Sequence, residues 1–76
     1  MDRKNIFKLA TYVRNLAFSN ALFQEKSLEL GIDTHTEPVF ALDCLREEMP
    51  EEFKEMMEIA RKSSVRDLVG EYLEKR

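Results

Sequence analysis

The segment from Glu37 to Phe53, EPVFALDCLREEMPEEF, organises the predicted fold. It holds one short helix, the start of another and the tight link between them. Pro38 and Pro50 mark the two helix starts, because proline is tolerated in the first turn, where its missing N–H is not needed. The segment therefore predicts helices over about 37–48 and 51–62.

The first of these helices is apolar in nearly every direction around its axis. Its apolar residues are Val39, Phe40, Ala41, Leu42, Cys44 and Leu45. A short helix of this kind is typical of the middle of a bundle, so we expect it to be central and Cys44 to be a small buried side chain. Thr36 is the expected N-cap.

Upstream of this segment, six apolar residues recur at three- and four-residue steps, the spacing of one helix face. They are Ile6, Leu9, Ala10, Val13, Leu16 and Ala17. Asp2 can cap such a helix, and Gly31 suits its C-terminal end. We expect one long first helix over about 3–30, either straight or bent near Ser19 and Asn20.

Downstream, a further apolar stripe consists of Val65, Leu68, Val69 and Tyr72. It is rotated by roughly 130° from the apolar stripe of the expected helix over 51–62. Ser64 and Asp67 have the spacing of a capping box, which predicts a short helix over about 65–75. This helix could fold back, fray or pair with a second chain. The expected fold is all-α: a single domain over 1–76 forming a small three- to four-helix bundle.

The expected first helix is apolar on two opposite faces. A second apolar stripe lies opposite the face formed by the six recurring apolar residues. It consists of Phe7, Phe18 and Leu22, with Thr11 beside them. A chain of 76 residues has few elements with which to cover both faces. Either the helix is sandwiched within its own domain, or the second stripe stays exposed and binds a partner. In the second case Phe7, Thr11, Phe18 and Leu22 are the candidate partner-binding residues.

The sequence contains no recognisable catalytic or metal-binding motif. It has two glycines in all, too few for a glycine-rich phosphate loop, and no nucleophile–base pair. His35 is a lone loop histidine without partners at ligand spacing. We therefore expect no enzyme activity, no catalytic or metal site and no cofactor. The single Cys44 rules out an internal disulfide, and neither a signal peptide nor a transmembrane run occurs, so we expect a soluble, cytoplasmic protein.

The charge of −3 is unevenly distributed. Residues 25–58 carry eleven acidic and three basic side chains, an acidic belt that would repel a phosphate backbone. Leu30, Gly31 and Ile32 are similar to the turn of a helix-turn-helix, but the recognition helix would then hold Arg46 as its only base. Direct nucleic-acid binding is therefore not expected.

Two segments resemble a known family. Around Pro38 and Pro50, a Pro-Val-aromatic-Ala run, an acidic helix and a Pro-Glu helix start resemble the theta subunit of bacterial DNA polymerase III and its phage-encoded homologue. The segment Asn15–Lys26, NLAFSNALFQEK, is similar to the first helix of that family. The chain differs in the link over 28–36, in one extra residue between the prolines and in its C-terminal segment.

The resemblance implies a non-catalytic three-helix accessory subunit that binds and stabilises the proofreading exonuclease subunit of the replicative polymerase. We accordingly expect a protein–protein interaction module whose partner is another protein or a second copy of itself. The alternatives are a small homodimeric regulator or inhibitor of a host protein, of the phage or plasmid type, and a helix-turn-helix DNA-binding protein.

Overall fold

The computed structural model describes residues 2–33 and 36–74, which form five α-helices and no strands. In chain order the helices are α1 (Arg3–Phe18), α2 (Ala21–Leu30), α3 (Pro38–Glu48), α4 (Pro50–Arg61) and α5 (Arg66–Glu74). The predicted all-α class is confirmed, but the described residues hold five helices where three to four were expected. No helix in these ranges is both long and apolar enough to cross a bilayer.

The prediction of one long helix over 3–30 is wrong, because the chain breaks where a bend was expected. The Ser19 hydroxyl donates to the Leu16 carbonyl oxygen over 2.6 Å. The Asn20 side chain accepts hydrogen bonds from the N–H groups of Leu22 and Phe23, at 2.9 and 3.2 Å, and so caps α2. Short polar side chains compete in this way with the helical hydrogen bonds of the backbone, and here they end one helix and start the next.

The predicted stop at Gly31 is confirmed. Gly31 has φ 75°, the left-handed conformation that glycine adopts without a Cβ penalty. The N–H of Ile32 donates to the Ser27 carbonyl oxygen over 2.8 Å, and that of Gly31 donates to the Leu28 carbonyl oxygen over 3.4 Å. These two bonds form a Schellman motif, and the buried Ile32 supplies its apolar contact.

Helix α3 begins one residue later than expected, and its N-cap is Glu37 rather than Thr36. The Glu37 carboxylate accepts the N–H of Phe40 over 2.9 Å, while Pro38 occupies the first turn. The Thr36 hydroxyl is used within the preceding loop, where it accepts the N–H of Asp33 over 2.8 Å. The N-cap is thus one residue further along the chain than expected.

The two boundaries of α4 differ in how well the sequence predicted them. Pro50 lies in the first turn of α4, as expected, and Met49 is the shared boundary residue of α3 and α4. At the other end, between α4 and α5, Ser64 was expected to be the capping residue. The hydroxyl of Ser63 instead accepts the N–H of Val65 over 3.3 Å. Helix α5 then covers 66–74 of the expected 65–75, and the last of those residues lies outside the described ranges.

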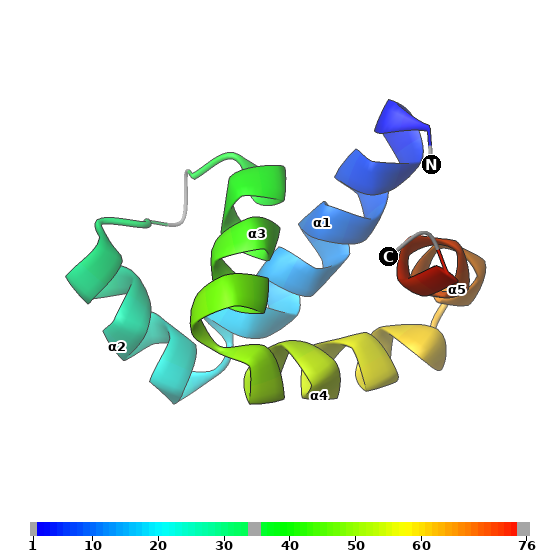
Figure 1. Cartoon of the computed structure of the whole chain (residues 1–76). Coiled ribbons are helices and arrows are strands. Elements are labelled where there is room, and N and C mark those ends of the chain that lie inside the picture. The colour runs from blue at the N-terminus through cyan, green and yellow to red at the C-terminus, as the bar shows by residue number, and fades with distance from the viewer. Residues whose placement is uncertain (1, 34–35, 75–76) are drawn as a thin grey trace.

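Helix α1, not α3, occupies the middle of the molecule. It packs against α2, α3, α4 and α5, and its residues Leu9, Ala10 and Val13 are fully buried. Helices α2 and α5 lie at opposite ends of the molecule (Figure 1). The prediction of a central α3 is wrong because α3 buries one side against α1 and α4 and leaves Phe40 53% exposed.

Candidate protein-binding surface

The break after α1 separates the residues of the predicted second stripe, so that they lie on two helices and differ in exposure. Phe7 and Thr11 lie one turn apart on α1, and the Thr11 hydroxyl donates to the Phe7 carbonyl oxygen over 2.8 Å. Phe18 lies at the end of α1, and Leu22 belongs to α2. Phe7 is 51% exposed and Leu22 57% exposed, so neither is covered by the later helices.

Phe18 is not part of the exposed surface around Phe7. It is partly buried and packs against the hydrophobic core. Its ring meets that of the buried Phe23 edge to face, with ring centroids 5.2 Å apart. This contact spans the break between α1 and α2, because the turn at Ser19 and Asn20 brings the start of α2 back beside the end of α1. Phe18 therefore joins two helices.

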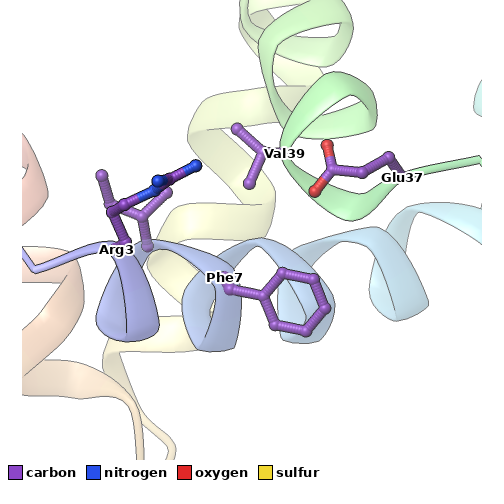
Figure 2. Close-up of a pocket in the computed structure, with 5 residues that line it drawn as sticks. Arg3, Phe7, Glu37 and Val39 are labelled. Atoms are coloured by element: carbon purple, nitrogen blue, oxygen red, sulfur yellow. The ribbon is translucent and has the colours of Figure 1, made fainter.

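A groove lies between α1 and the start of α3, and we call it the α3-side groove. It has a volume of about 390 Å³ and is lined by Arg3, Ile6, Phe7, Glu37 and Val39. Figure 2 shows Arg3 and Phe7 on α1, with Val39 and Glu37 opposite them at the start of α3. The groove thus combines apolar walls with one charge of each sign.

Phe7 also borders a groove on its other side, between α1 and the turn before α5. This α5-side groove has a volume of about 440 Å³ and is lined by Phe7, Lys8, Thr11, Tyr12, Asn15, Ser64 and Val65. Val65 is buried, and Tyr12 packs against the core. Phe7 therefore forms an exposed ridge between two grooves that share its side chain.

The loop before α3 is held to α1 by Arg14. One guanidinium nitrogen of Arg14, Nη1, donates to the Thr36 carbonyl oxygen over 2.9 Å. Its Nε is buried without a hydrogen-bond partner among the described residues. Because Thr36 directly precedes Glu37, this contact helps to position the wall of the α3-side groove opposite α1.

The described residues contain no group of three or more His, Cys, Asp or Glu side chains able to hold a metal ion, and His35 lies outside the described ranges. Cys44 is half-buried rather than buried, because α3 is covered on one side only. Burial, followed by the negative charges of Asp43, Glu47 and Glu48, raises the pKa of the Cys44 thiol. A raised pKa disfavours the nucleophilic thiolate.

The helix-turn-helix alternative finds no support in the packing. In a helix-turn-helix the two helices form one unit, whereas α3 packs most extensively against α1. The exposed residues of α3 and its N-cap include Glu37, Phe40, Glu47 and Glu48, which would repel a phosphate backbone or offer it no contact.

The sequence did not indicate which side chains complete the two grooves. Val39 and Val65 lie far along the chain from Phe7 and reach it only through the packing of α3 and α5 on α1. The sequence also did not predict that Phe40 is exposed. The apolar residues on most sides of α3 could have indicated it, because a helix at the edge of a bundle cannot bury all of its sides.

The chain matches no protein-family model, no curated protein and no solved structure. The resemblance in residues 15–26 and 37–53 therefore stays a prediction, and a function has to be argued from the surface around Phe7.

Proposed function

We propose that the chain is a non-catalytic protein–protein interaction module, an accessory subunit that binds a larger protein through Phe7 and the two grooves beside it. The observation that carries the proposal is the 51% exposure of Phe7 on the helix that forms the centre of the fold. An aromatic side chain on a rigid helix between two grooves is a suitable anchor for a partner, since binding can remove its remaining apolar area from water.

The energy available from this anchor is modest but measurable. Full burial of a phenylalanine side chain stabilises by about 1.5–3 kcal/mol, and about half of Phe7 is still exposed. Its covering by a partner is therefore worth about 1 kcal/mol or more, which corresponds to roughly five- to tenfold in affinity.

The first partner to test is the proofreading exonuclease subunit of a replicative polymerase, which the resemblance to the theta subunit implies. Two features support this choice. Pro38 and Pro50 both lie in the first turns of helices, as the similar segments require. Helix α1 is central in the fold, yet it carries the half-exposed Phe7, which leaves an apolar side chain for a partner to cover.

The proposal is tested by measuring affinity for that subunit by calorimetry with Phe7→Ala and Phe40→Ala variants. Phe40 is the matched control: it is the same side chain with nearly the same exposure, 53%, and it lines neither groove. We expect Phe7→Ala to weaken binding roughly five- to tenfold and Phe40→Ala to leave it unchanged. Equal affinity of Phe7→Ala and the unchanged chain would contradict the proposed site.

A second candidate function, the homodimeric regulator, is favoured by one observation. Helix α2 has only ten residues, yet it exposes Leu22, Leu28 and Leu30, with Leu28 81% exposed. A second copy could cover these leucines. Light scattering on the purified chain separates the two candidates, because a dimer dissociated by Leu28→Ala would place the interface on α2, and a monomer would leave Phe7 as the binding surface.

A further inference from the structure

We infer that the α5-side groove binds an acidic amphipathic segment of the partner, one that places an apolar side chain against Phe7 and carboxylates beside Lys8. This inference rests on the proposed function and names the chemistry of the partner at the same site. It is carried by the charges around the groove and by their contrast with the groove on the other side of Phe7.

The α5-side groove carries positive charge alone. Lys8 is the only charged side chain among the residues that line it. Lys8 is exposed, and Lys4, one turn earlier on α1, is exposed as well. No acidic residue occurs from Arg3 to Gln24, so α1 itself supplies no carboxylate to neutralise these lysines.

The opposite wall of the groove is formed by Ser64 and Val65, which are uncharged. The exposed Lys62 and Arg66 lie close to them in sequence, although neither lines the groove. Arg66 is paired with the solvent-exposed Asp67, whose carboxylate lies 3.9 Å from the guanidinium. An exposed pair of this kind is weak and easily exchanged for a partner's carboxylate.

The groove also has apolar walls, which a partner must match. Phe7, Tyr12 and Val65 supply these walls beside Lys8. A matching segment therefore needs at least one apolar side chain with acidic residues on either side. Complementary charge of this kind raises the association rate and excludes basic competitors.

The α3-side groove shows why the charge selects one groove. Arg3 and Glu37 lie on its two walls, so its charges balance and it has no preference for an acidic or a basic segment (Figure 2). Phe7 is common to both grooves, and only the α5-side groove distinguishes the sign of the partner's charge.

An acidic protein segment fits the groove better than a nucleic acid does. A phosphate backbone offers no apolar side chain for the walls formed by Phe7 and Val65, so it can match only the positive charge of Lys8. A carboxylate-bearing helix of another protein meets both the apolar and the basic groups at once.

The test is a titration of the ¹⁵N-labelled chain, followed by amide chemical shifts. The probe is a synthetic helical peptide with leucines at i, i+3, i+4 and i+7 on a glutamate background. Its counterparts are the same peptide on a lysine background, the glutamate peptide with alanine for leucine, and a short oligothymidylate. We expect shifts at Phe7, Lys8, Thr11 and Val65 with the first peptide only.

Two charge-reversal variants sharpen the result. Lys8→Glu should weaken binding of the acidic peptide roughly fivefold or more, whereas the same change at Lys54, another exposed lysine, on α4, should not. Raising the salt from about 50 to about 300 mM should weaken binding of the acidic peptide in the unchanged chain. Circular dichroism of Lys8→Glu verifies that the fold is kept.

Three outcomes overturn the inference: equal binding of the lysine peptide, shifts confined to the α3-side groove, or the same shifts with oligothymidylate. They leave the proposed function standing if Phe7→Ala still loses the protein partner. Conversely, a Phe7→Ala variant that keeps the partner overturns the proposed function, whatever the peptides do.

Discussion

At the scale of single residues, two phenylalanines of α1 illustrate how position within one helix decides a role. Phe7 is half exposed between two grooves, whereas Phe18 packs on the core and meets Phe23 edge to face at 5.2 Å. Both belong to the same predicted stripe, and only the break after Phe18 separates them. The first is placed for binding and the second for holding α2 against α1.

We predict that Phe18→Ala lowers the free energy of unfolding by about 1–2 kcal/mol, because it removes core packing and an aromatic pair. Phe7→Ala should cost less, about 1 kcal/mol or below, since half of its side chain is already in water. Urea unfolding followed by circular dichroism measures both. Similar losses for the two variants would show that Phe18 is no more a core residue than Phe7.

Cys44 gives a prediction on pH. Burial and the neighbouring carboxylates raise its pKa, so the folded chain holds less thiolate at a given pH than the unfolded chain does. Alkylation by iodoacetamide should therefore be slower for the folded protein and reach its half-maximal rate at a higher pH than in urea. The same shift favours the protonated thiol on folding, so its contribution to stability is lost as the pH rises through the alkaline range. A folded thiol that reacts as fast as the unfolded one contradicts this.

At the scale of elements, the two glycines have opposite roles. Gly31 ends α2 with φ 75°, whereas Gly70 lies within α5, and a Cβ at either position would meet nothing within 4 Å. Space is therefore not a factor, and backbone conformation decides the effect of a substitution.

We predict that Gly31→Ala destabilises the chain by about 1–2 kcal/mol, because alanine is strained in the left-handed region. Gly70→Ala should stabilise by about 0.5–1 kcal/mol, because alanine loses less entropy in a helix. Thermal unfolding of both variants under one condition compares the signs. A stabilising Gly31→Ala would mean that the chain leaves α2 without the Schellman motif.

The helix boundaries that the sequence predicted well are those set by local chemistry. Pro38, Pro50 and Gly31 restrict the backbone wherever they occur, so their effects do not depend on the rest of the fold. The break at Ser19 and Asn20 was harder to predict, because the residues after it continue the periodicity of α1. The hydrogen bonds of these two side chains to the backbone outweigh that periodicity.

The candidate site was predictable only in part, for a different reason. The exposure of Phe7 follows from the helical periodicity of α1, which places it opposite Leu9 and Val13. The walls formed by Val39 and Val65 depend on how α3 and α5 pack on α1, and a local pattern holds no information on that packing. For the same reason the sequence could identify α3 as apolar without showing that too few neighbours exist to surround it.

At the scale of the whole molecule, α5 determines whether the fold closes. The sequence left open whether the C-terminal segment folds back, frays or pairs with a second chain. In the structure α5 packs on α1 and α4, with Val69 buried, and the turn before it, with Ser64 and the buried Val65, forms one wall of the α5-side groove. The fold and the proposed binding surface therefore depend on the same closure.

A polar contact joins α5 to α3 over 26 positions of sequence: the Arg46 Nη1 donates to the Tyr72 hydroxyl oxygen over 2.6 Å. Tyr72→Phe keeps the ring beside Phe53, 6.3 Å between centroids, and removes only the hydroxyl. We predict a loss of about 1 kcal/mol in unfolding free energy, because the partly buried guanidinium loses an acceptor.

Tyr12→Phe is the matched control for this variant, since no hydrogen bond of the Tyr12 hydroxyl holds two helices together in the described residues, and it should change stability by about 0.5 kcal/mol or less. Hydrogen exchange locates the effect: Tyr72→Phe should speed the exchange of α5 amides before those of α1, since α5 is the element released. If both tyrosine variants lose the same stability, the bond to Arg46 does not hold α5 in place, and the packing of the Tyr72 ring does so instead.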